Sequence, residues 1–395
     1  MVKMDSEQGE YRKQLVGFCQ GEPYGPHTWS GSNRGIFSAL RDRDLLIDVF
    51  NVEVKGRHRY WAALREYSLD RAVWKQNFMK SPYQFAIRTR NASRYLSQVI
   101  PGKPSAVLQI GAMFDAVAAH RTLPRFCYLD SNSALSGKGG KESFSYYAKK
   151  KYKNLALSRE RDIYHNSAGI FVFSNYVKDS LVQDFNVPEK RIHTIYAGVN
   201  ITVPPVPIEQ DKKPIVLFVG RDFDRKGGPL LLKAFARVKI TIPAAKLIIA
   251  GSSPSVNIPG VEVIGFIDKN TKEGENRLLE LYQQAAVFTM PSHFEPFGIV
   301  YAEAMHFGLS CVGVNHCAMP EIISDGVTGL LVEPDNEVEL ANALVAILEN
   351  RALSRSMGNE AIKKASRLFR WEVVAEKMAG VIDTSREKTW LRAAT

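Results

Sequence analysis

The sequence Met-Pro-Ser-His-Phe-Glu-Pro-Phe-Gly-Ile-Val-Tyr-Ala-Glu-Ala-Met, from Met290 to Met305, decides the fold of this chain. The apolar run 285–290 predicts a buried strand that ends at Pro291, and Ile299–Phe307 predicts a helix. A strand, a loop and a helix in this order are typical of an open α/β sheet, in which ligands bind beyond the carboxyl ends of the strands. The stretch therefore predicts both the sheet and a binding site in the loop.

The loop and the start of the helix offer the groups that bind a phosphate. The first N–H groups of a helix have no partner within the helix and carry a partial positive charge. A glycine at 298 lets the backbone approach a phosphate closely. We therefore expect Phe297, Gly298, Ile299 and Val300 to contact a diphosphate.

Two carboxylates, Glu295 and Glu303, flank this loop. Along a helix they would lie about 12 Å apart, and further if part of the path is extended, which is roughly the span of a nucleotide sugar. We expect Glu303 to accept hydrogen bonds from ribose hydroxyls and Glu295 to hold the sugar ring. The alternative is that the two glutamates share no task.

Length and composition indicate a soluble protein of two domains. The chain has 395 residues, of which 45% are hydrophobic and 24% charged. It lacks the run of about 18 apolar residues that a membrane-spanning helix needs, and its polar first residues do not resemble a signal peptide. Its four cysteines show no C-x-x-C spacing and suit reduced thiols. We therefore expect a cytoplasmic protein, with a peripheral position on the inner face of a membrane as a second expectation.

The positive charge lies in the first half of the chain. Residues 1–200 hold 30 Lys and Arg against 18 Asp and Glu, whereas residues 201–395 hold 22 against 23. This asymmetry predicts an anionic partner for the first half: a phospholipid surface, a lipid-phosphate carrier or an acidic glycan. No nucleic-acid recognition motif is present, so we expect no nucleic-acid partner. A solvated basic face is the alternative.

The first half contains a second unit of strand, loop and helix. Leu15–Cys19 reads as a strand, and a loop rich in Gly and Pro leads to a helix from about Ile36. Ala106–Ile110 and Arg125–Leu129 read as buried strands, and the latter is followed directly by Asp130. An Asp at this point can meet a substrate or simply begin a turn.

Residues 55–95 are rich in Arg and aromatic residues and predict helices. Such helices can lie on a membrane with their basic side chains toward anionic headgroups. Ordinary packing, with the arginine stems covering apolar surface, is the alternative.

A proline-rich tract from Val203 to Pro214 predicts a domain boundary near residue 205. A strand, Ile215–Val219, follows it and leads into the loop Gly220–Gly228 and a helix over Leu230–Val238. In this loop Arg221 and Lys226 can hold a diphosphate and stabilise the charge that develops as it leaves. The strand-helix alternation continues through residues 246–267 and 310–314, which predicts a Rossmann-like sheet.

These motifs, in this order, resemble retaining GT-B glycosyltransferases of family 4 (glycosyl transferases group 1). Glu295 and Glu303 with their flanking residues match the E-x7-E motif of that family, and Arg221 and Lys226 match its arginine and lysine before a Lys-Gly pair. The resemblance implies α/β GT-B architecture: an acceptor domain over residues 1–204, a nucleotide-sugar domain over 205–368, the two facing a cleft, and a helix over 369–395 that crosses back to the first domain.

The family implies a role for further residues. Gly31 and Ser32 would face the donor phosphates and the acceptor, the backbone at Phe266 and Ile267 would read the nucleotide base, and Asp130 would meet a sugar. The predicted catalytic residues are Glu295, Arg221, Lys226 and Asp130. The predicted donor-binding residues are Gly31, Ser32, Gly220, Arg221, Lys226, Phe266, Ile267, Phe297, Gly298, Ile299, Val300 and Glu303.

The implied reaction moves a hexosyl unit, with retention of configuration, from a nucleotide-diphosphate sugar to a hydroxyl of a glycan or lipid-linked acceptor. A UDP-sugar is favoured and a GDP-sugar is the alternative. No metal and no cofactor beyond the nucleotide sugar is expected. The competing hypothesis is a non-catalytic subunit of the same fold that binds nucleotide sugars or polyanions. The family usually has two glycines before its Pro-Glu pair, whereas this chain has Ala318 and Met319.

Overall fold

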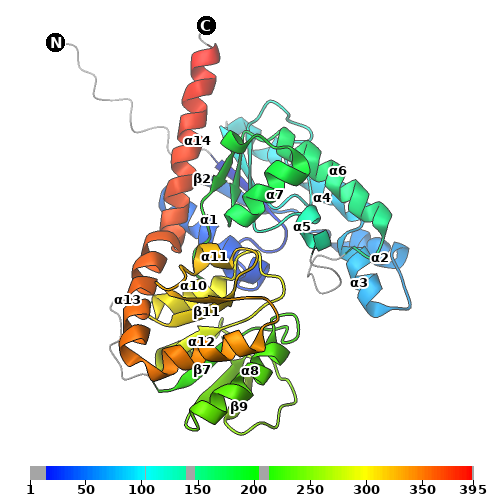
Figure 1. Cartoon of the computed structure of the whole chain (residues 1–395). Coiled ribbons are helices and arrows are strands. Elements are labelled where there is room, and N and C mark those ends of the chain that lie inside the picture. The colour runs from blue at the N-terminus through cyan, green and yellow to red at the C-terminus, as the bar shows by residue number, and fades with distance from the viewer. Residues whose placement is uncertain (1–14, 103, 139–146, 204–212, 394–395) are drawn as a thin grey trace, which may run out of the picture. The chain divides into compact units, whose positions relative to one another are not determined.

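The computed structural model describes residues 15–102, 104–138, 147–203 and 213–393. The chain forms two compact units, one of Met1–Tyr196 with Trp371–Thr395 and the other of Ala197–Arg370 (Figure 1). Each unit is built around one six-stranded sheet in which every pairing is parallel. This confirms the predicted fold class of two Rossmann-like α/β domains. The predicted boundary between residues 204 and 205 lies in the stretch 204–212, outside the described residues, and stays a prediction.

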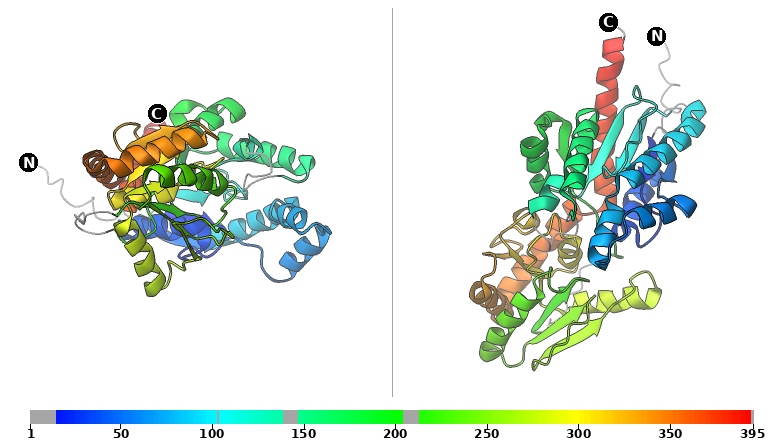
Figure 2. Two further views of the ribbon diagram at one scale, coloured as in Figure 1. Left: turned by 60° about the horizontal axis from the view of Figure 1, so that its bottom comes forward. Right: turned by 90° about the vertical axis from the view of Figure 1, so that its right-hand side faces the viewer.

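The first sheet has the strand order β2-β1-β3-β4-β5-β6. Its inner strands β3 and β4 are buried along their whole length, because helices cover both faces of a parallel sheet (Figure 2). The strands are β1 (Leu15–Cys19), β2 (Leu46–Asn51), β3 (Ala106–Ile110), β4 (Arg125–Leu129), β5 (Gly169–Val172) and β6 (Ile192–Thr194). The three predicted for β1, β3 and β4 are confirmed at both ends.

Three helices of the first unit begin directly after a glycine or a residue whose side chain caps the helix. α1 starts at Ser32, earlier than the predicted Ile36, because Gly31 before it has φ +94° and turns the chain into the helix. Asp70 and Ser81 cap α3 and α4 with their side chains. The α-helices are α1 (Ser32–Asp42), α2 (Gly56–Arg65), α3 (Arg71–Met79), α4 (Pro82–Val99), α5 (Ser133–Lys138), α6 (Lys150–His165), α7 (Asn175–Phe185) and α14 (Trp371–Ala393). The helices predicted over 55–95 are confirmed.

The second sheet has the order β12-β11-β10-β7-β8-β9. The predicted strands at 215–219 and 310–314 are confirmed, whereas β9 ends at Gly265 rather than Ile267 because Gly265 has φ +79°, outside the extended region. The strands are β7 (Ile215–Val219), β8 (Lys246–Ala250), β9 (Val261–Gly265), β10 (Val287–Thr289), β11 (Ser310–Val314) and β12 (Gly329–Val332).

Helices join these strands in the second unit. The helix α10, which follows the loop at 290–298, begins at Ile299 as predicted and ends at His306. α8 is longer at both ends than the predicted 230–238. The α-helices are α8 (Gly228–Thr241), α9 (Lys272–Gln284), α10 (Ile299–His306), α11 (Met319–Ile322), α12 (Glu337–Glu349) and α13 (Arg351–Leu368).

Two further observations concern the whole described chain. None of the described helices is both long enough and apolar enough to cross a membrane. The four cysteines are free thiols, as expected, and burial raises the pKa of Cys19 to about 12. A thiol with such a pKa is protonated and unreactive at neutral pH.

Candidate active site

The direction in which the chain adds strands to the second sheet reverses between β7 and β10. From β7 the chain adds strands toward β9, and from β10 it adds them toward β12 on the other side, although β7 and β10 themselves pair side by side. Loops that follow two such strands diverge and leave room for a ligand at their carboxyl ends. These loops are 220–227 and 290–298. They carry the predicted donor residues Gly220, Arg221, Lys226, Phe297 and Gly298, and the predicted catalytic residue Glu295.

The two loops are in direct contact. Gly227 has φ +77°, and a Cβ built on it would overlap the carbonyl oxygen of Pro291. The backbone N–H of His293 donates to the carbonyl of Arg225 at 3.3 Å, and the Arg225 guanidinium donates to the carbonyl of Phe294 at 3.3 Å. The loops therefore form one packed element rather than two independent ones.

Lys226 and Glu295 form an ion pair across this contact, between the Lys226 ammonium and Glu295 Oε2. Both side chains are largely buried, at 15% and 13% exposed. A pair screened from water in this way interacts more strongly than a surface pair. Glu295, predicted to hold a sugar, is thus itself held in place by the predicted diphosphate-binding lysine.

Arg221 lies at the exposed side of the same loop. Its guanidinium carbon is 5.0 Å from the centroid of the Phe266 ring, which is 59% exposed. Among the described residues no carboxylate lies within ion-pair distance of Arg221. The preceding residue, Gly220, donates its N–H to the carbonyl of Ala250 at 2.9 Å. The structure therefore brings Gly220, Arg221, Phe266 and the neighbouring Ile267 to one edge of the sheet.

The helix α10 begins without a side-chain cap. Its N-cap residue, Gly298, has φ +82°. Phe297 is buried and packs edge-on against Phe369, with the ring centroids 5.8 Å apart. This anchors the loop while the first N–H groups of Ile299 and Val300 receive no side-chain acceptor, so the helix end offers donors to an anion.

Met319 occupies the place of one of the two usual glycines. It is buried, and its methyl carbon would lie 2.9 Å from a Cβ on Gly298. Ala318 has φ −88° and ψ −1°, an ordinary backbone conformation for any residue. The departure from Gly-Gly therefore creates no backbone strain, and it packs a methionine behind the start of α10.

Glu303 is buried, with 1% of its surface exposed. The hydroxyl of Tyr282 donates to its Oε2 at 3.1 Å, and Lys269 Nζ lies 3.7 Å from its Oε1. Within the described residues, Oε1 has no hydrogen-bond partner. Burial and the nearby Glu303 raise the pKa of Tyr282 well above its usual value, so its hydroxyl remains a donor. A buried carboxylate oxygen without a donor is unfavourable and suits a ligand hydroxyl.

Lys269 and Tyr282 were not among the residues predicted from the sequence. Lys269 follows Phe266 closely in the loop after β9, so its place beyond a strand end was a usable signal. Tyr282 lies in the last turn of α9, where its spacing is that of a core residue. Only the folded structure brings its hydroxyl to Glu303.

In the first unit, the direction in which the chain adds strands to the sheet reverses between β1 and β3. The loop after β1 ends in a 3-10 turn, Thr28–Gly31, with φ +49° at Trp29 and +58° at Ser30. Trp29 Nε1 donates to Asp130 at 2.8 Å. Trp29 thus ties the loop that precedes Gly31 and Ser32 to Asp130. Ser32 is buried, with 1% of its surface exposed.

Two family models match consecutive parts of this chain. The model of Glycosyltransferase Family 4 matches residues 40–203, and that of Glycosyl transferases group 1 matches residues 202–364. An uncharacterised glycosyltransferase of Methanocaldococcus jannaschii is 28% identical over 247 residues, which are 56% of this chain and 62% of that protein. The chain thus spans less than two thirds of this curated relative.

Solved structures share the fold. Sucrose-phosphate synthase from Thermosynechococcus elongatus has a TM-score of 0.66 at 19% identity, covering 97% of this chain and all (100%) of that one. Anabaena Alr3699/HepE, solved in complex with UDP and glucose, has a TM-score of 0.61 at 15% identity, covering 94% of this chain and 100% of that one.

Proposed function

Because the chain belongs to the GT-B glycosyltransferases of group 1 and family 4, we propose that it transfers a hexosyl unit from a nucleotide-diphosphate sugar to an acceptor hydroxyl, with retention of configuration. The observation that carries this proposal is the ion pair of Lys226 and Glu295 at the point where the second sheet changes direction. It supports the proposal because it brings together a cation and a carboxylate, the groups that we propose hold the diphosphate and the sugar.

The diphosphate is proposed to bind between Arg221, Lys226 and the first turn of α10. Arg221 has no carboxylate partner among the described residues, and α10 has no side-chain cap. Cations and N–H dipoles preorganised in this way stabilise the negative charge that grows on the leaving phosphate. In this proposal these groups do the work that a metal does elsewhere, so transfer is expected to persist in the presence of a chelator.

The ribose is proposed to bind at Glu303. Its Oε1 is the buried acceptor that lacks a donor, and a ribose hydroxyl supplies one. The aromatic ring of Phe266, exposed beside Arg221, offers a face against which a base can stack. UDP is the first nucleotide to test because the Anabaena structure was solved with it.

In the proposed reaction the acceptor oxygen bonds to C1 of the sugar on the face from which the diphosphate leaves. The bond between C1 and the phosphate oxygen breaks first, which produces an oxocarbenium-like state. The departing phosphate takes the proton of the acceptor hydroxyl, so no separate base is needed. Glu295, held by Lys226, orients the sugar ring.

The test is a thermal-shift panel with UDP-, GDP- and ADP-sugars, followed by release of the nucleotide with and without acceptors. A ligand that binds only the native state raises the melting temperature by mass action. We expect one nucleotide to give a selective shift that Arg221→Ala abolishes and Arg277→Ala, an exposed arginine on α9, preserves. No shift with any donor would contradict the proposal, and a shift without turnover would favour the non-catalytic subunit.

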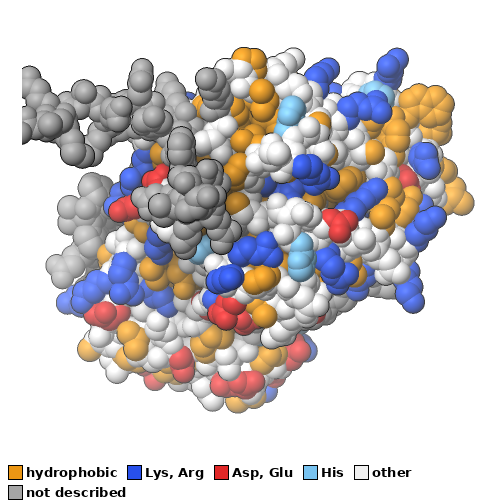
Figure 3. Space-filling model, turned by 90° about the horizontal axis from the view of Figure 1, so that it is seen from above, with side chains coloured by type: hydrophobic (Ala, Val, Ile, Leu, Met, Phe, Trp, Pro, Cys, Tyr) orange, Lys and Arg blue, Asp and Glu red, His pale blue; other side chains and the backbone are white. Residues whose placement is uncertain are grey.

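We further propose that α2 and the segment after it contact an anionic membrane. Five large apolar side chains are exposed there, from 63% at Trp61 to 92% at Leu69. Exposed arginines accompany them, and apolar side chains lie among Lys and Arg at the right-hand edge of Figure 3. We name this set the aromatic-basic surface. It consists of Arg57, Tyr60, Trp61, Leu64, Arg65, Tyr67, Leu69 and Arg71.

Aromatic rings with arginines are the side chains that favour the headgroup region of anionic bilayers. We expect the protein to co-sediment with phosphatidylglycerol vesicles, less so at high salt, and weakly with phosphatidylcholine. The double variant W61S/L64S should lose this binding. Ile240→Ser, which alters a residue 82% exposed on the second unit, should keep it. Equal binding by both variants would reject the aromatic-basic surface as the membrane contact.

A further inference from the structure

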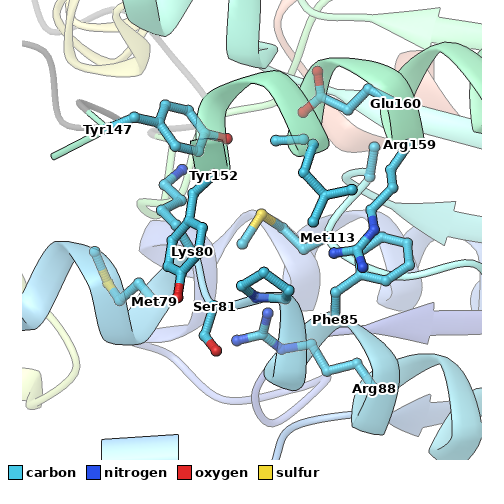
Figure 4. A pocket seen from close by; sticks show the side chains of 14 residues that line it. Met79, Lys80, Ser81, Phe85, Arg88, Met113, Tyr147, Tyr152, Arg159 and Glu160 are labelled. Atoms are coloured by element: carbon cyan, nitrogen blue, oxygen red, sulfur yellow. The ribbon is translucent and has the colours of Figure 1, made fainter. Parts of the chain in front are cut away.

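A cavity lies within the first unit, between the turn from α3 to α4, the segment after β3 and the helix α6 (Figure 4). Three cationic side chains line it: Lys80 after α3, Arg88 in α4 and Arg159 in α6. Among the described residues none of the three has a carboxylate within ion-pair distance. The chain therefore gathers three positive charges around one cavity, and none of them forms an ion pair within the described residues.

Arg88 is a buried cation whose hydrogen bonds are incomplete. The residue is 2% exposed, and its guanidinium donates to Gln84 Oε1 at 2.6 Å. Its Nε has no acceptor within the described part of the chain. A buried cation costs several kcal/mol unless charge and hydrogen bonds compensate it. An anion in the cavity would supply both.

Aromatic rings hold the other two cations in place. The guanidinium carbon of Arg159 lies 4.2 Å from the centroid of Phe85, and Lys80 Nζ lies 4.8 Å from that of Tyr147. A cation over a ring face is positioned without losing its charge. Figure 4 shows these side chains around the cavity.

Burial disfavours the charged forms of Arg88 and Lys80. It lowers the pKa of Arg88 to about 10 and lowers that of Lys80. Arg88 thus remains charged at neutral pH, and its charged form is destabilised by the loss of water. A bound anion would restore the interactions that water no longer supplies.

Glu160 is the carboxylate that lines the cavity. Its two oxygens already accept hydrogen bonds from Ser133, from the hydroxyl at 2.6 Å and from the N–H at 2.9 Å. Burial raises the pKa of Glu160. The lining holds three cationic side chains and this one carboxylate, so its net charge is at least +2. This excess matches a phosphate monoester, which carries about two negative charges near neutral pH.

We propose that this cavity binds a phosphate group on the acceptor. The inference rests on the proposed glycosyl transfer, because it names the chemical class of the acceptor of that reaction. Lys80, Arg88 and Arg159 would hold the phosphate oxygens by charge-assisted hydrogen bonds, which are stronger than neutral ones. The acceptor is then a phosphorylated sugar or a lipid phosphate rather than a neutral glycan.

The first test is a calorimetric titration of the full chain with inorganic phosphate in the presence of saturating UDP, so that a nucleotide site cannot take up the phosphate. Lys80→Met and Arg159→Gln should each weaken phosphate binding by about tenfold or more, as expected for loss of a charged hydrogen bond. Arg161→Gln and Arg90→Gln, exposed neighbours on the same two helices, should not change it. Arg88 is 2% exposed, so Arg88→Gln would change folding as well as phosphate binding.

Equal phosphate affinity in Arg159→Gln, Lys80→Met and the controls, or no phosphate binding at all, would overturn the inference. The UDP-induced rise in melting temperature is measured on the same samples and reports on the donor site alone. Its retention while phosphate fails to bind would reject the phosphate site and leave the proposed function standing.

The source of the phosphate is settled by competition. Glucose 6-phosphate and vesicles that contain phosphatidic acid are each tested for displacement of inorganic phosphate. Displacement by the former identifies a soluble sugar phosphate, and displacement by the latter a lipid phosphate. Failure of both would contradict the assignment to an acceptor.

Discussion

The ammonium group of Lys226 contacts the carboxylate of Glu295 and so joins the loops that follow β7 and β10. These residues are 69 positions apart in the chain, yet their strands are neighbours in the sheet. In the proposed function, this pair lets one site serve a diphosphate and a sugar together. A change at either residue should therefore affect both binding of the donor and its orientation.

Lys226→Ala should lower the rate of transfer by about 100-fold to 1000-fold, the usual effect of removing one preorganised charge-stabilising group. The reason is the loss of a cation beside the leaving phosphate and of the partner that positions Glu295. Initial rates at saturating donor measure this. Lys233→Ala, an exposed lysine on α8, is the matched control, and equal activity of the two variants would show that Lys226 has no such role.

Gly227→Ala should destabilise the protein by more than about 1 kcal/mol, because a Cβ at a left-handed position is unfavourable even in open space and here it would also overlap Pro291. Gly380→Ala on α14 meets no atom within 4 Å. It should stabilise the helix by about 0.5–1 kcal/mol. Urea unfolding of both variants measures the contrast, and a neutral Gly227→Ala would mean that the loops separate without cost.

The buried oxygen of Glu303 predicts a requirement for ribose hydroxyls. UDP should bind more tightly than its 2′,3′-dideoxy analogue by about tenfold or more, the effect of hydrogen bonds to a charged group. In Glu303→Ala the two ligands should bind alike. Tyr282→Phe keeps the carboxylate but removes its 3.1 Å hydrogen bond, so discrimination should persist there. Discrimination that survives in Glu303→Ala would place the ribose elsewhere.

His193 predicts a dependence of stability on pH. Burial, and after it the charge of Lys178, lowers the pKa of His193 below 6.5 in the folded protein. As the pH falls through 6.5, the unfolded chain binds the proton first, so the folded state loses stability. The melting temperature of the wild type should therefore fall more between about pH 7 and pH 5 than that of His193→Gln. Lys178→Met should reduce part of the loss, and parallel curves for all three proteins would exclude His193 as the cause.

Local sequence was enough to predict the elements on which the site is built. The apolar runs at 15–19, 106–110, 125–129, 215–219 and 310–314 became strands at those bounds, and α10 begins at Ile299 as predicted. Each prediction depended on residues close in the chain: an apolar run, a glycine or a proline at its end. The class of fold followed from the alternation of these elements.

Tertiary structure alone decided which of these elements meet. The order of strands places β7 beside β10, and only this adjacency pairs Lys226 with Glu295. The contact of Trp29 with Asp130 and the cavity around Arg88 likewise join residues far apart in the chain. Hydrophobic burial and chain connectivity select such contacts over the whole domain, whereas the spacing of residues in a sequence reports only on neighbours within a few turns or strands. The sequence by itself therefore determined the strands, the loops and the chemistry that they carry, and the order of strands and the packing within each unit decided which side chains share a site.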